Sequence, residues 1–100
     1  MYALLYRWRL VRGAESEFKQ AWSDMTVSIR SQCGSFGSRL HRCDDGTWVA
    51  YAVWPDRESR QRCMPDNPSA AAVMSTAVLE RFEPLRLTVV TDLISGPLTA

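Results

Sequence analysis

The stretch GTWVAYAVWP, residues 46–55, decides the fold of this 100-residue chain. After Thr47 it has no charged or strongly polar side chain before Pro55, and its residues form two alternating sets: Trp48, Ala50, Ala52 and Trp54, and Val49, Tyr51 and Val53. Side chains of a strand point alternately to the two faces of a sheet. An antiparallel sheet with one face in water therefore shows a polar residue at every second position. The stretch predicts a strand over residues 47–54 with both faces covered.

The residues before this strand predict a hairpin. Asp44-Asp45-Gly46 is typical of a tight turn, because Asp and Gly tolerate the positive φ that such turns require. A strand over residues 38–43 is therefore expected to pair with residues 47–54.

Working outward, two further elements follow from periodicity. Residues 2–11 alternate between apolar and other side chains, which predicts the first strand. The spacing of Phe18, Trp22, Met25 and Ile29 places these side chains on one stripe of a helix over residues 14–31.

The second half of the chain reads as helix followed by strand. Asp56 is a candidate N-cap for a short helix over residues 57–64, whose arginines Arg57, Arg60 and Arg62 are expected to face solvent. Asn67 and Pro68 are typical of a cap and first position of a helix, here reaching Arg81. After Pro84, residues 85–94 predict the last strand, and residues 95–100 a loose tail.

The order β-α-β-β-α-β predicts one α+β domain over residues 1–100, with a ferredoxin-like, four-stranded antiparallel sheet and helices on one face. Helices cover only one side of such a sheet. Since the other side is also apolar, we expect a homodimer formed through the sheet.

Composition excludes several classes of partner. The net charge of +1 gives no field that favours nucleic acid, and no apolar run is long enough to span a membrane. The N-terminus does not resemble a secretory signal. Three cysteines, Cys33, Cys43 and Cys63, show no C-x-x-C spacing, which argues against a disulfide framework and against a metal site. We therefore expect a reduced, cytoplasmic protein.

YRWRLVRG (residues 6–13), the pairs Glu17-Phe18 and Ala21-Trp22, and GTWVAYAVWP resemble the antibiotic biosynthesis monooxygenase family. The resemblance implies a dimeric α+β barrel. It also implies one of the family's activities, among them cofactor-free oxidation of polyphenolic aromatics with O₂ and haem degradation. Haem-degrading members carry an iron-ligating histidine on the helix before the last strand and an asparagine on the first strand. Residues 68–81 contain no histidine and residues 2–11 no asparagine, which disfavours haem degradation. We expect no cofactor.

Three residues are candidates for catalysis. Trp54 matches a family position where tryptophan lines the substrate cavity, although a core tryptophan is the plainer interpretation. His41, the single histidine, has a side chain suited to act as a base on a phenol, but a lone strand histidine is more often a surface or interface group. Asn67 could bind a substrate carbonyl or enolate, or simply cap its helix.

Further residues are candidates for substrate binding, each with core packing or a place at the dimer rim as the alternative: Tyr6, Trp8, Trp22, Tyr51, Met74 and Arg86. Two functions follow. One is a cofactor-independent monooxygenase acting on a small phenol or hydroquinone with O₂. The other is a non-catalytic dimeric small-molecule-binding or accessory protein. An open cavity of several hundred Å³ with inward polar groups favours the first, and a closed apolar space favours the second.

Overall fold

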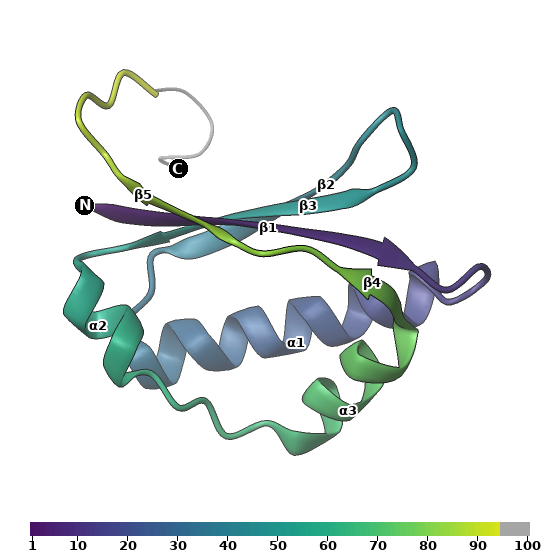
Figure 1. Ribbon diagram of the computed structural model, residues 1–100. Coiled ribbons are helices and arrows are strands. Elements are labelled where there is room, and N and C mark those ends of the chain that lie inside the picture. Colours follow the sequence, from purple (N-terminus) through teal and green to yellow (C-terminus); the bar gives the residue numbers. More distant parts are fainter. Residues whose placement is uncertain (95–100) are drawn as a thin grey trace.

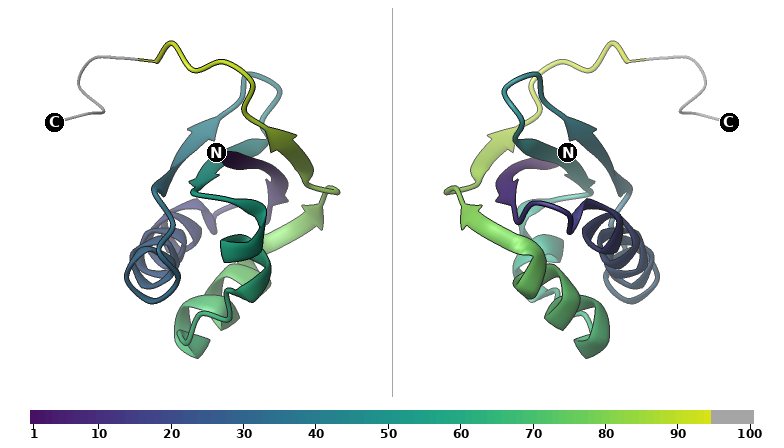
Figure 2. Two further views of the ribbon diagram at one scale, coloured as in Figure 1. Left: turned by 90° about the vertical axis from the view of Figure 1, so that its left-hand side faces the viewer. Right: turned by 90° about the vertical axis from the view of Figure 1, so that its right-hand side faces the viewer.

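The structure, a computed structural model, describes residues 1–94, and the expected loose tail 95–100 lies outside the described residues. A twisted antiparallel sheet forms one layer, and the helices cover one of its faces (Figures 1 and 2). The strands are β1 (Tyr2–Leu10), β2 (Gly37–Arg42), β3 (Trp48–Trp54), β4 (Val78–Arg81) and β5 (Leu85–Thr88). The expected α+β class, with an antiparallel sheet and its helices on one face, is confirmed.

The sheet has five strands in place of the expected four. Its order is β2-β3-β1-β4, and β5 also pairs with β1. β4 lies against residues 8–10 of β1 and β5 against residues 2–5, so the two follow each other along one edge. They are separated at Glu83 and Pro84, and a proline has no N–H to donate to the ladder. Together they fill the position of the expected last strand, which ends at Thr88 and not at residue 94.

The helices are α1 (Glu15–Cys33), α2 (Arg57–Arg62) and α3 (Pro68–Ala77). Asp56 and Asn67 are N-caps as expected, with side chains that accept from Ser59 N and Ala70 N. The expected extension of α3 to Arg81 is wrong, since Val78–Arg81 form β4. The free edge of β1 offers these residues sheet hydrogen bonds, and Val11 N donates to Ala77 O at 2.8 Å where the chain turns back.

The register of the sheet separates two faces. Tyr2, Leu4, Tyr6 and Trp8 stand opposite Trp54, Ala52, Ala50 and Trp48, so these side chains share the helix-covered face. The core on this face includes Trp8 and Phe18, which are 5% and 0% exposed. A second buried cluster of Tyr2, Leu4 and Trp54 lies toward α2.

The outer face of the sheet carries no helix (Figure 2). Its central strands contribute Leu5, Val49, Tyr51 and Val53 by alternation, and β5 adds Leu85 and Leu87. The chain after β5 leaves the sheet on this side (Figures 1 and 2), with Val90 90% exposed. Within residues 1–94, none of the helices has the length and apolar character needed to cross a membrane.

Candidate functional site

A cavity of about 220 Å³ lies between the helices and the covered face of the sheet. The sheet contributes Tyr6, Trp8, Ala52 and Trp54, and α1 contributes Trp22, Met25, Thr26 and Ile29. Met74 of α3 and Pro65 of the α2–α3 connection add to the lining, which is mostly apolar. This arrangement follows from two periodicities: the alternation of β1 and β3, and the helical stripe of α1.

Stacked aromatic rings form part of the sheet side of the cavity. The rings of Tyr6 and Trp8 are parallel to within 7°, with centroids 5.8 Å apart. Trp8 also meets Phe18 edge to face at 5.2 Å, which fixes the indole from behind. The wall offers a flat apolar surface on which another aromatic ring can stack.

One end of the cavity is polar. Arg60 of α2 donates from Nε and Nη2 to Tyr6 Oη, at 3.3 and 3.2 Å. Its guanidinium carbon lies 5.9 Å from the ring centroid of Trp54. Because Tyr6 Oη accepts from Arg60, the proton of the Tyr6 hydroxyl is left to donate to another group.

Trp54 also lies at this end of the cavity. It is 3% exposed and lines the cavity. Among residues 1–94, its Nε1–H is the buried side-chain polar atom that has no hydrogen-bond partner. A buried donor without an acceptor is costly, and the surrounding atoms cover this N–H, so a molecule in the cavity does not contact it.

The helix that carries Arg60 is fixed at its start. Asp56 Oδ1 accepts from Ser59 N at 2.7 Å, and this hydrogen bond holds the pKa of Asp56 below its ordinary value. An ionised N-cap stabilises α2 and thereby the position of Arg60.

Arg81 is the second cationic residue of the lining. It stands opposite Trp8 in the β1–β4 pairing and is more exposed than Arg60, at the rim of the cavity. Ser38 also lines the cavity, but its hydroxyl already donates to Tyr51 O at 3.1 Å.

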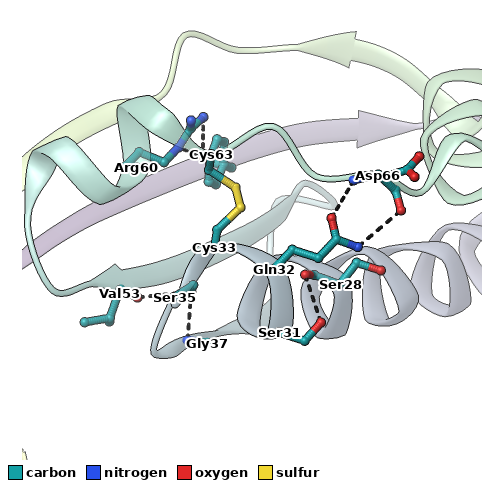
Figure 3. The surroundings of a disulfide bond; sticks show 11 residues. Ser28, Ser31, Gln32, Cys33, Ser35, Gly37, Val53, Arg60, Cys63 and Asp66 are labelled. Carbon is teal, nitrogen blue, oxygen red and sulfur yellow. Dashed lines mark hydrogen bonds between the residues drawn. A yellow bond between two sulfur atoms is a disulfide. The ribbon is translucent and has the colours of Figure 1, made fainter.

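A disulfide closes the other side of this end (Figure 3). Cys33, the last residue of α1, is bonded to Cys63 after α2, with the Cα atoms 5.3 Å apart. Beside it, Gln32 Oε1 accepts from Asp66 N at 2.7 Å and Gln32 Nε2 donates to Asp66 O at 3.3 Å. Cys63 and Pro65 belong to the lining, so these bonds attach a wall of the cavity to α1.

The expectation that all three cysteines are reduced is therefore wrong for two of them. Cys33 and Cys63 are 30 residues apart, and only the packing of α2 beside the end of α1 brings them together. Their spacing along the chain carries no such signal. Cys43 remains free and exposed.

The cavity brings together five of the residues singled out from the sequence: Tyr6, Trp8, Trp22, Trp54 and Met74. These are the aromatic and apolar members of the set, and their places follow from the periodicity that suggested them.

Four others lie elsewhere. By register, Tyr51 and His41 are on the outer face, where His41 is exposed with Nδ1 3.0 Å from Val49 O. Asn67 caps α3 and donates from Nδ2 to Ser28 Oγ at 3.0 Å, and it does not line the cavity. Arg86 is exposed beside Glu83, with 3.6 Å between Nη1 and Oε1.

Sequence reasoning missed Arg60 and Arg81. Arg60 was expected to face solvent with Arg57 and Arg62, yet it is half-buried against Tyr6 and Trp54. Arg57 also lies over an aromatic ring, with its guanidinium carbon 5.3 Å from the ring centroid of Tyr2. A six-residue polar helix has no apolar stripe that could show which arginine turns inward.

No protein-family model matches this sequence, and no curated protein matches it. Solved structures do share its fold. SnoaB from Streptomyces nogalater, a cofactor-independent oxygenase, is 21% identical, with 94% of this chain and 97% of that chain covered and a TM-score of 0.76. A putative antibiotic biosynthesis monooxygenase from Chloroflexus aurantiacus is 17% identical, with 95% and 98% covered and a TM-score of 0.73.

A third structure, of a putative antibiotic biosynthesis monooxygenase from Deinococcus radiodurans, is 11% identical over 96% of this chain and 100% of that chain, with a TM-score of 0.74. These identities establish the fold alone. The fold is that of the antibiotic biosynthesis monooxygenases, as the sequence resemblance implied.

Proposed function

We propose that this protein is a cofactor-independent monooxygenase that oxidises a small phenol or hydroquinone with O₂. The observation that carries the proposal is the cavity with an aromatic wall and a polar end made by Tyr6 and Arg60. Its volume of about 220 Å³ is below the several hundred Å³ expected of an enzyme pocket, and its inward polar groups are what favours catalysis over a closed apolar space. The fold shared with a cofactor-independent oxygenase gives further support.

In this proposal the substrate ring stacks on Trp8 and Tyr6, and its hydroxyl lies at the polar end. The Arg60 guanidinium lowers the pKa of the bound hydroxyl, because a nearby positive charge favours the phenolate. The Tyr6 hydroxyl donates to the phenolate oxygen. The cavity thus stabilises the anion, and the hydroxyl proton is released to solvent, from which the reduced oxygen later takes it back.

The phenolate supplies all the electrons. A ring carbon of the phenolate forms a bond to one oxygen atom of O₂, and its C–H bond breaks as the carbon becomes a carbonyl. The O–O bond breaks, and the second oxygen leaves as water with the ring proton and the hydroxyl proton. A phenol and O₂ thus give a quinone and water, and the four electrons that the phenol loses reduce O₂. The apolar lining excludes bulk water from the reacting carbon.

We also propose that the working form is a homodimer joined through the outer face. On that face and its borders, Phe36, Leu85 and Leu87 are 60%, 57% and 36% exposed. The chain from Val89 to Ile94 extends past β5 on the same side, with Val90 and Leu93 largely exposed (Figure 2). A second copy related by a two-fold axis would bury both surfaces at once.

Measurement of O₂ uptake with a set of hydroquinones and phenols tests the proposed chemistry. We expect uptake above buffer, with one O₂ consumed per product molecule. Tyr6→Phe removes one donor to the anion and should lower kcat by about 100-fold. Tyr51→Phe makes the same chemical change on the outer face and should leave kcat unchanged.

If substrates bind but no O₂ is consumed, the proposed enzyme is refuted in favour of a non-catalytic small-molecule-binding protein. Equal losses in Tyr6→Phe and Tyr51→Phe would refute the assignment of this cavity as the site.

A further inference from the structure

The side chains that line the cavity carry a net positive charge. Arg60 and Arg81 both belong to it, and no Asp or Glu does. Within residues 1–94 the three ion pairs involve Arg7, Arg9 and Arg86, so neither lining arginine is neutralised by a carboxylate. Two guanidinium groups without a carboxylate partner, beside a mostly apolar cavity, favour an anionic ligand.

The two arginines reach the cavity from different elements. Arg60 belongs to α2 and Arg81 to β4, and Figure 1 places α2 and β4 at the two ends of α1. Arg60 directs Nε and Nη2 to Tyr6, whereas no side-chain hydrogen bond of Arg81 is formed with residues 1–94. A ligand with two polar ends, one for each arginine, matches this arrangement.

The volume limits the size of the ligand. An engineered apolar cavity of about 150 Å³ holds a benzene molecule. The cavity here is about 220 Å³, which adds room for substituents on one ring but not for a large fused polyphenol. A guanidinium also matches a carboxylate well, because its parallel N–H groups donate to both oxygens.

We infer that the cavity binds a hydroxylated monocyclic aromatic carboxylate, with its hydroxyl toward Arg60 and Tyr6 and its carboxylate toward Arg81. The inference deepens the proposed function and rests on it for the role of the hydroxyl end. The carboxylate end is outside the reaction and determines which phenols are accepted.

Calorimetric titration with 4-hydroxybenzoate and its neutral isostere 4-hydroxybenzamide tests the charge requirement. We expect the acid to bind at least about tenfold more tightly, since a hydrogen bond to a charged group is stronger than a neutral one. Arg81→Gln should abolish this preference without weakening the amide. Arg62→Gln removes the same charge from an exposed site that does not line the cavity, and should keep the preference.

Benzoate tests the orientation. It should bind more weakly than 4-hydroxybenzoate, and Tyr6→Phe should reduce that difference, because the hydroxyl then loses a partner. Since Tyr6→Phe also removes the acceptor of Arg60, the variant is compared with wild type by this difference and not by affinity alone.

Equal binding of the acid and the amide would overturn the inference, as would equal effects of Arg81→Gln and Arg62→Gln. The O₂ assay separates this failure from that of the proposed function. Tight binding of the acid without O₂ uptake refutes the monooxygenase and supports the ligand class. Uptake with neutral phenols and no preference for acids refutes the ligand class alone.

Discussion

Loss of the Cys33–Cys63 disulfide should strongly lower the stability of the protein. The bond closes a loop between two cysteines that are 30 residues apart in the sequence. Cross-linking a loop of this length removes chain entropy from the unfolded state and is worth about 3.5 kcal/mol at 25 °C. We expect the free energy of unfolding to fall by about this amount in the Cys33→Ser, Cys63→Ser double variant. That is a large part of the total stability of a domain this size.

Urea unfolding followed by tryptophan fluorescence measures the change. The midpoint should fall, and the slope m should rise, because an unfolded chain without the cross-link exposes more surface. A reducing agent should give wild-type protein the midpoint of the double variant. Cys43→Ser, at the free and exposed cysteine, should change neither quantity. A decrease of less than about 1 kcal/mol in the free energy of unfolding would refute the entropic reasoning. An equal effect of Cys43→Ser would refute the pairing.

Three further changes test other parts of the structure. Phe18→Ala should lower the free energy of unfolding by about 3–5 kcal/mol in denaturant titrations, since Phe18 is 0% exposed at the centre of the core. Sedimentation velocity should show the proposed dimer for wild type and a monomer for Val53→Asp, whereas a dimer unchanged by the substitution would contradict assembly through the outer face. Hydrogen bonds from the Thr47 hydroxyl and backbone N–H hold the pKa of Asp45 well below its ordinary value, so its contribution to stability is present above the unfolded-state pKa and is lost as pH falls below it. Asp45→Asn should therefore lose less stability than wild type between about pH 5 and pH 2, and parallel curves would contradict this role.

The sequence predicted the sheet, α1 and the two N-caps because these depend on local signals. Alternation identified β1 and β3, and a three-and-four spacing identified the stripe of α1. The switch from α3 to β4 at Val78 was missed, because Val78–Arg81 become a strand only by pairing with the edge of β1. The secondary-structure propensity of these four residues gives no information about that edge.

The candidate site also has a part that the sequence predicted and a part that it did not. Its aromatic wall was predicted, since apolar side chains on a covered face are visible as a pattern. Its cations and its disulfide were not, because Arg60, Arg81, Cys33 and Cys63 meet only through tertiary packing. His41 and Tyr51 appeared in the candidate set because of their chemistry, and alternation within β2 and β3 places them on the other face.

Neighbouring residues of β1 serve different surfaces. Tyr6 contributes to the cavity, while Leu5 and Arg7, on either side of it, belong to the outer face. A deletion of one residue within the paired segment, residues 2–8, would rotate every later side chain of the strand to the opposite surface. The lining of the cavity and the outer face would then change together. Insertions and deletions within β1 therefore preserve both surfaces only when they change its length by an even number of residues. The cavity lining and the outer face are constrained together by this strand.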